Sequence, residues 1–216
     1  AAGDFLKKHF PLMKTNASEA RECPTLLMNG FGGHRIEGIG DKHIPWIHNV
    51  RNTDLISAIR DEDCMWLLRL FNESEGINYL KKSGIEPELA DKLELLGISS
   101  ICNLLSAIKM AKYFEYNEND VIITIFTDSA EMYQSRLQEQ KALKGNYTEM
   151  QAAIDRESVL NAQSYDNLLE LSYRDKKRIH NLKYYTWVEQ QGKTYQEIMQ
   201  QWEPAYWTET FESNLE

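Results

Sequence analysis

Residues 121–133 have the sequence VIITIFTDSAEMY, and this stretch determines the fold class that we expect. Its first half, residues 121–126, is the clearest strand pattern in the chain, because it is a short apolar run rich in β-branched residues. Both faces of such a strand are apolar, which is typical of a strand buried inside a parallel sheet. Residues 127–129 follow as a turn, and a helix is expected after them. A buried strand that leads through a turn into a helix predicts an α/β fold.

Helical patterns lie on both sides of this stretch. Apolar spacing predicts helices over residues 61–71, 86–96 and 103–114, and a first helix over residues 1–10 that ends before Pro11. Residues 12–20 are expected to form a short strand and turn. Further helices are expected over roughly 131–143, 148–160, 164–172, 174–191 and 194–202, with Thr148 and Thr194 as N-caps.

These elements predict two portions of the chain. Residues 1–137 are expected to form an α/β portion with three αβα layers around a mainly parallel sheet. Residues 138–216 are expected to form an all-helical extension that is dense in aromatic side chains. We expect the extension to pack over the core, with a dimer interface or a lid as the alternative.

The composition limits the function classes. Of the 216 residues, 42% are hydrophobic, which is enough for the core of one large domain or of one domain with an appendage. Lys and Arg number 24 against 33 Asp and Glu, and the net charge of −9 argues against nonspecific binding to nucleic acid or to an anionic membrane. No apolar run reaches the ~18 residues of a transmembrane helix, and no signal-peptide pattern is visible.

The cysteines are far apart and form no CxxC pair. Cys23, Cys64 and Cys102 are therefore expected to be free buried thiols, not a disulfide framework or a zinc ribbon. Free thiols favour a reducing compartment, and we expect a cytoplasmic protein.

Residues 26–50 form a long stretch without helical or strand periodicity. Loops of this length in compact domains usually carry function. His34, His43 and His48 lie in it, but their spacing lacks the tight pairs of a zinc site, and no cysteine is near them in sequence. We therefore expect no metal site, and we expect these histidines to bond within the loop or to contact a substrate anion.

Two short motifs are weak when taken alone. The sequence GIG at residues 38–40 is too short for a dinucleotide-binding fingerprint and by itself predicts a plain turn. The sequence GISS at residues 97–100 stands where a turn meets a helix, so its serines are either helix caps or hydroxyls that face a ligand beside free backbone N–H groups. Residues 127–129 stand at the carboxyl end of the predicted strand, where open parallel sheets bind ligands.

Taken together, these motifs resemble the C-terminal half of cysteine synthase (O-acetylserine sulfhydrylase). In that family the matching pieces are about G-I-G-x-x-x-I-P, E-G-I…G-I-S-S-G and V-x-I-x-P-D-S-G-E-R-Y. This chain has EGIGDKHIP, NESEGI…LLGISSI and VIITIFTDSAEMY, and residues 23–137 align in this order. The resemblance implies a fold-type-II pyridoxal-phosphate enzyme with a tryptophan synthase β-like fold, in a subgroup with a longer tail.

The resemblance also implies roles for particular residues. Ser99 matches the serine that hydrogen-bonds the pyridine nitrogen of pyridoxal 5′-phosphate. Gly38, Ile39 and Gly40 match the loop that passes beside the cofactor and substrate. Asp128 and Ser129 match the loop near the edge of the ring. A neutral hydroxyl at the ring nitrogen favours β-elimination and β-replacement over transamination.

The chain departs from the family pattern at several points. Ile101 stands where the family has a glycine, and Thr127 where it has a proline. No lysine lies in the family's Schiff-base context, and no Gly/Thr-rich phosphate cradle is present, so no residue of this chain is assigned a catalytic role. Because the chain also lacks an initiator Met, we expect a fragment or a processed chain whose N-terminal half is encoded upstream and which is inactive alone.

Three functions remain open from the sequence. The first is a pyridoxal-phosphate lyase or transferase of amino-acid metabolism that acts on a small β-substituted amino acid such as O-acetylserine, as a homodimer. The second is a noncatalytic interaction module on the same scaffold. The third is a threonine/serine dehydratase-type lyase of the same fold. An upstream reading frame that encodes a lysine and a Gly/Thr-rich loop would favour an enzyme.

Overall fold

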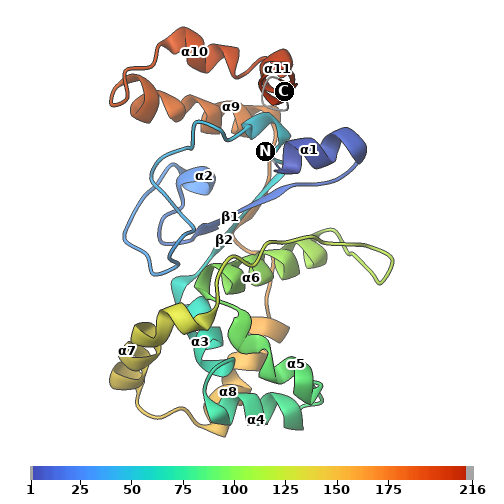
Figure 1. Cartoon of the computed structure of the whole chain (residues 1–216), viewed down its shortest axis with the longest axis vertical. Coiled ribbons are helices and arrows are strands. Elements are labelled where there is room, and N and C mark those ends of the chain that lie inside the picture. The colour runs from blue at the N-terminus through green and yellow to red at the C-terminus, as the bar shows by residue number, and fades with distance from the viewer. Residues whose placement is uncertain (1, 213–216) are drawn as a thin grey trace.

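A computed structural model describes residues 2–212 and shows a small mixed sheet at its centre (Figure 1). The strands are β1 (Asn16–Ala20), β2 (Leu55–Ile59) and β3 (Leu168–Glu170), in the order β1-β2-β3. β1 pairs with β2 in parallel, with Asn16 opposite Leu55, and β2 pairs with β3 in antiparallel orientation. Every residue of β2 is buried, because this apolar strand is the central one.

Helices surround the sheet on two sides. They are α1 (Ala2–His9), α2 (Thr25–Met28), α3 (Asp61–Leu70), α4 (Ser74–Lys82), α5 (Pro87–Asp91), α6 (Ile98–Tyr113), α7 (Gln134–Lys144), α8 (Glu149–Asp155), α9 (Tyr173–Asn181), α10 (Tyr195–Gln200) and α11 (Pro204–Glu212). Short 3₁₀ turns cover Val50–Asn52, Leu93–Leu95 and Ala130–Tyr133, and π-helical turns cover Arg156–Asn161 and Tyr184–Val188. In Figure 1, α3 to α8 lie on one side of the sheet and α9 to α11 on the other.

The apolar side chains form two clusters that correspond to these two groups of helices. The larger cluster surrounds α3 and α6 and includes Leu67, Leu68 and Leu105. The smaller cluster joins the loop before β2 to α9 through Ile44 and Ile179. Among the described residues, no helix has both the length and the apolar character needed to cross a bilayer.

The α/β class and several predicted helices are confirmed. The predicted helix 61–71 is α3, with acidic residues in its first turn, and the first helix covers Ala2–His9, with residue 1 outside the described part. Thr148 and Thr194 are N-caps, since their side chains accept hydrogen bonds from the N–H groups of Gln151 and Glu197. The mainly parallel three-layer arrangement stays a prediction, because the described sheet combines one parallel with one antiparallel pair.

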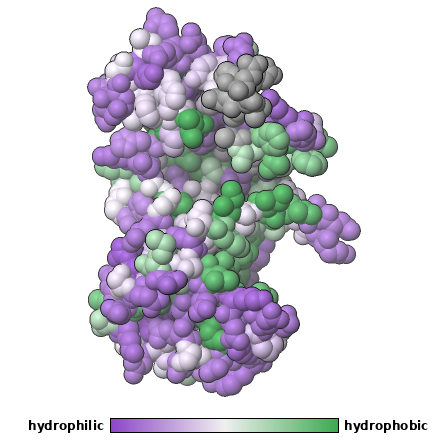
Figure 2. Space-filling view, in the orientation of Figure 1, coloured by the Kyte–Doolittle hydropathy of each residue, from purple (hydrophilic) through white to green (hydrophobic). Residues whose placement is uncertain are grey.

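The predicted buried strand at residues 121–126 is wrong. The segment has no strand structure and is largely exposed, with exposed fractions of 84% for Val121, 74% for Ile123 and 62% for Ile125. The carbonyl of Ile125 accepts a hydrogen bond from Asn103 Nδ2 at 3.0 Å, a side chain and not a neighbouring strand. An apolar pattern becomes a strand only where another strand pairs with it, and the described sheet contains no such neighbour. Figure 2 shows hydrophobic surface where the segment crosses α6.

The predicted helix at residues 164–172 is also wrong. Leu168–Glu170 form β3, so the extension is not all-helical. Asn167 has a φ of 53°, a left-handed conformation that interrupts a helix, and its carbonyl accepts a hydrogen bond from Ala58 N at 2.9 Å. Pairing with the buried strand β2 therefore overrides the local pattern.

The core continues through the predicted boundary at residue 137. Tyr147, Ala152 and Val159 belong to the same apolar cluster as α3 and α6, and β3 completes the sheet. The division at residue 137 stays a prediction about organisation, but the extension supplies side chains and a strand to the part that precedes it.

Candidate active site

The candidate site is built around the first turn of α6. Helix α6 begins at Ile98, with Gly97 in the N-cap position, so Ser99 lies in the turn whose backbone N–H groups have no partner within the helix. The N–H of Gly97 donates to the carbonyl of Asp128 at 3.0 Å. A Cβ at Gly97 would lie 2.1 Å from Asp128 Oδ1, so only glycine lets the loop at residues 127–129 come this close.

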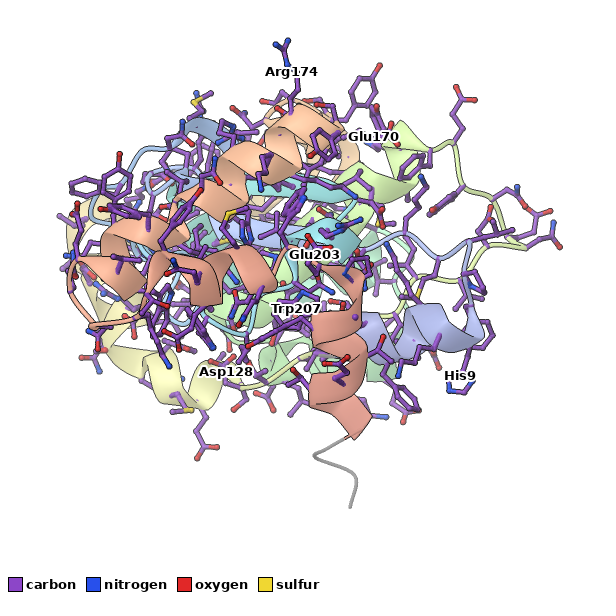
Figure 3. All side chains as sticks on the ribbon, turned by 90° about the horizontal axis from the view of Figure 1, so that it is seen from above. His9, Asp128, Glu170, Arg174, Glu203 and Trp207 are labelled. Carbon is purple, nitrogen blue, oxygen red and sulfur yellow. The ribbon has the colours of Figure 1, made fainter. Side chains whose placement is uncertain are left out.

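Ser99 joins this loop through its side chain. Its Oγ lies 3.1 Å from Thr127 Oγ1 and donates to Asp128 Oδ1 at 3.2 Å, and the residue is 5% exposed. Asp128 Oδ2 also accepts a hydrogen bond from the hydroxyl of Tyr133. Burial, together with this carboxylate, raises the pKa of Tyr133 well above its ordinary value, so the hydroxyl stays protonated and keeps donating. In Figure 3, Asp128 lies close to α7.

The glycine loop passes on the other side of Ser99. Gly38 has a φ of +86°, and a Cβ on it would lie 4.0 Å from Ser99 Cβ, so the two residues are direct neighbours. Gly40 has a φ of +95°, and a Cβ there would lie 3.2 Å from both Ala20 Cβ and His34 Nε2. His34 Nε2 also donates to the carbonyl of Gly40 at 2.9 Å. The loop therefore runs between the carboxyl end of β1 and the start of α6, and the positive φ of Gly38 and Gly40 favours glycine at both positions.

The remaining predicted site residues play smaller parts in this geometry. Ile39 packs its half-buried side chain against the main apolar cluster, and its backbone forms the middle of the glycine loop. Ser129 is half-buried and begins the turn Ala130–Tyr133, and its carbonyl accepts a hydrogen bond from Met132 N at 3.2 Å. The structure thus brings Ser99 together with Gly38 and Asp128, with Ser129 as the next residue along the chain.

A cavity of about 510 Å³ opens beside the glycine loop. Its lining residues are Ala17, Ser18, Glu19, Leu26, Gly38, Ile39, Gly40, Asp41, His43, Pro45 and His48. Ser99 and Asp128 are not among them, whereas Gly38, the neighbour of Ser99, is. The cavity thus lies at the carboxyl end of β1, where parallel strands usually present ligand-binding residues.

Glu19 is a cavity residue that the sequence analysis missed. It lies in β1, is 3% exposed, and its carboxylate accepts hydrogen bonds from the N–H groups of Leu26 at 2.8 Å and Leu27 at 2.9 Å. Burial raises the pKa of Glu19 to about 6, against the opposing effect of these hydrogen bonds. The cavity wall therefore contains a buried carboxyl group with a raised pKa. No sequence signal marked Glu19, because its role depends on its burial.

The three loop histidines form hydrogen bonds to residues near them in the chain, although His34 Nδ1 is buried without a partner among the described residues. His43 Nδ1 lies 2.9 Å from Asp41 Oδ1, and His48 Nε2 lies 2.8 Å from Thr53 Oγ1. Burial lowers the pKa of His48 to about 4, so its imidazole is neutral at physiological pH. Within residues 2–212, no group of three His, Cys, Asp or Glu side chains gathers in a way that could hold a metal ion.

Comparison with known proteins points to one family name. The chain is 31% identical over 133 residues to cysteine synthase B of Campylobacter jejuni, a match that covers 62% of this chain and 38% of that protein. It is similar to cysteine synthases. The cysteine synthase of Staphylococcus aureus (strain Mu50) is 28% identical over 133 residues, or 62% of this chain and 37% of the relative. This chain therefore matches less than two fifths of the length of these relatives. No family model matches the chain.

Proposed function

We propose that this chain forms part of a pyridoxal-phosphate-dependent, cysteine synthase-like enzyme that carries out β-elimination or β-replacement on an O-activated serine-type amino acid. The observation that carries the proposal is the contact between Gly38 and Ser99 at the N-terminus of α6, with the loop of Asp128 on the other side. The similarity to cysteine synthases supports it.

The residues present fit one end of the cofactor. The Ser99 hydroxyl is a neutral donor that would bond the pyridine nitrogen in exchange for its present partners, Thr127 and Asp128. Gly38 has no side chain, so no Cβ stands beside this hydroxyl on the side of the glycine loop. When bound, the cofactor supplies an electron sink for breaking bonds at the substrate's α and β carbons. The neutral Ser99 hydroxyl would leave the ring nitrogen without a full charge, and the weaker electron sink would favour β-elimination and β-replacement over transamination.

The cavity beside the glycine loop is assigned to the amino-acid substrate. Gly38 and Gly40 offer backbone groups, and the neutral His48 imidazole, with its Nε2 held by Thr53, keeps its orientation. Glu19 holds or releases a proton near neutral pH at the end of β1. We infer that the protonation state of Glu19 sets the charge of this wall.

The proposal places the cofactor-binding lysine outside this chain's cavity. No lysine is among the cavity-lining residues in the described part of the chain, and the match covers 38% of the first relative. The same observation favours a second candidate function, a noncatalytic module on the same scaffold. An intact polypeptide that contains this sequence and binds the cofactor covalently would decide for the enzyme.

The test is a pair of serine variants on α6 in that intact polypeptide. Ser99→Ala removes the proposed donor to the ring nitrogen, so we expect a shift of the cofactor's absorbance maximum and a loss of roughly 10-fold or more in turnover of O-acetylserine. Ser106→Ala is the matched control, because Ser106 is also buried in α6 and its Oγ has no hydrogen-bond partner within residues 2–212. Equal spectra and equal rates for both variants would remove Ser99 from the site.

A further inference from the structure

The C-terminal segment binds three carbonyl groups of the loop that leads away from the glycine motif. The indole Nε1 of Trp187 donates to the carbonyl of Ile44 at 2.8 Å. The ammonium Nζ of Lys183 donates to the carbonyls of Trp46 and His48, each at 2.9 Å. These acceptors lie around a turn in which the N–H of His48 donates to the carbonyl of Pro45 at 3.0 Å, and all three carbonyls are bound by the extension.

Lys183 is the centre of this contact. The residue is 0% exposed, and its third hydrogen bond goes to Gln201 Oε1 at 2.5 Å. Each of the three N–H groups of its ammonium therefore has an oxygen acceptor. The Trp207 ring centroid lies 5.5 Å from Nζ. In Figure 3, Trp207 projects from α11 on the side that faces the molecule. Lys183 has no ion pair with a carboxylate in the described part of the chain, and burial lowers its pKa to about 7.

A buried lysine that donates only to neutral acceptors is costly, because its charge loses hydration without gaining an opposite charge. An apolar side chain in its place would avoid this cost but would leave the three oxygen acceptors without their donor. The contacts of Lys183 therefore indicate what the residue does in the fold. Two of its three partners are backbone carbonyls of the segment that walls the cavity, where Pro45 and His48 are lining residues.

We propose that Lys183 is a positioning residue that fixes the outer wall of the cavity by holding the carbonyls of Trp46 and His48. The extension thereby sets the width of the cavity opposite the glycine loop. The positioning role stands on the geometry alone, whereas its effect on a substrate rests on the proposed function. Lys183 itself touches neither the cavity nor the proposed cofactor site.

The experiment is hydrogen exchange of the whole chain, measured peptide by peptide. Lys183→Met keeps most of the volume and removes all three donors, so peptides covering residues 44–49 should exchange about 10-fold faster or more, while peptides of α3 keep their rate. Trp187→Phe removes the bond to Ile44 and keeps an aromatic ring, which gives a milder variant should Lys183→Met fail to fold. We expect it to speed exchange in the same peptides by a smaller factor.

Ile198→Ala is the matched control. Ile198 is buried in α10 and its loss leaves a cavity in the extension, but its side chain donates to no carbonyl of the loop. If Ile198→Ala speeds exchange at residues 44–49 as much as Lys183→Met does, the effect is general loosening and the positioning role is overturned. Unchanged exchange at residues 44–49 in both Lys183→Met and Trp187→Phe overturns it as well.

A kinetic measurement separates this inference from the proposed function. In the intact enzyme, Lys183→Met should raise KM for the amino-acid substrate about 10-fold and change kcat much less, because the wall positions substrate and takes no part in the chemistry. Faster loop exchange with an unchanged KM would keep the positioning role and overturn the assignment of this cavity to the substrate.

Discussion

At the scale of single residues, the candidate site depends on glycines whose missing side chains let segments meet. Gly97 is the clearest case, since any Cβ there would overlap the carboxylate of Asp128. We predict that Gly97→Ala lowers the free energy of unfolding by roughly 2 kcal/mol or more, because the loop at residues 127–129 must move away and its hydrogen bonds break. Urea unfolding measures the change.

Gly33→Ala is the control for that prediction. A Cβ at Gly33 has no neighbour within 4 Å, and its backbone conformation is one that alanine adopts without strain. Its free energy of unfolding should change by less than about 1 kcal/mol. Equal losses for the two variants would mean that the contact between Gly97 and Asp128 does not hold the loop.

The resemblance to cysteine synthases implied that Gly38, Ser99 and Asp128 belong to one site, although 61 and 29 residues separate them in the chain. The structure places the three residues close together, whereas their roles towards a cofactor stay predictions. Glu19 and Lys183 were not predicted, since their importance comes from burial. A glutamate in a short strand and a lysine in a polar helical stretch are ordinary in sequence, and only the folded structure shows that water does not reach them.

At the scale of elements, the two wrong predictions have a common cause. Residues 121–126 have a strong strand pattern and form no strand, whereas Leu168–Glu170 lie in a stretch predicted to be helical and form β3. Strand formation depends on a pairing partner, and that partner lies far away in the chain. Helices such as α3 need no such partner, and their local signals were sufficient.

The exposure of residues 121–126 gives a test at this scale. Ile123→Ser should change the free energy of unfolding of this chain by less than about 0.5 kcal/mol, because the side chain is already in water. Ile56→Ser, in the buried strand β2, should cost about 3 kcal/mol or more, since it leaves a cavity and buries a hydroxyl. A large loss for Ile123→Ser would show that the segment is covered.

Helix α9 supplies a pH-dependent contribution to stability. His180 is 2% exposed, its Nε2 donates to the carbonyl of Ile198 at 2.9 Å, and burial lowers its pKa to about 4 from 6.5. As the pH falls, His180 therefore becomes protonated at a higher pH in the unfolded chain than in the folded chain. This contribution is complete above pH 6.5 and is lost as the pH falls towards 4, by up to roughly 3 kcal/mol. The lowered pKa of His48 adds a contribution to stability that is likewise lost as the pH falls.

The measurement is a series of urea unfolding curves between pH 4 and 8. In His180→Gln, the loss of stability on acidification should be shallower than in the unmodified chain, because one proton-linked group is gone. His9→Gln, at the exposed end of α1, is the matched control and should leave the slope unchanged. If His180→Gln and the unmodified chain lose stability equally as the pH falls, His180 makes no pH-dependent contribution.

At the scale of the whole molecule, the extension is a structural part of the fold. It contributes β3, the apolar residues around Tyr147 and the buried Lys183. We predict that a chain ending at residue 137 loses cooperative unfolding, because the removed residues expose α3, β2 and the loop before β2. Circular dichroism during a urea titration measures this. A sharp unfolding transition for residues 1–137 would instead support two independent portions.

The central claim of this account is that Ser99, between Gly38 and Asp128, is the partner of a pyridine nitrogen. The most direct measurement is the ¹⁵N chemical shift of ring-labelled pyridoxal 5′-phosphate bound to the intact polypeptide that contains these residues. We predict the shift of an unprotonated, hydrogen-bonded nitrogen, and a move to the protonated value in Ser99→Asp. A protonated nitrogen in the unmodified protein, or a ¹⁵N chemical shift that is the same in Ser99→Asp, would contradict the account.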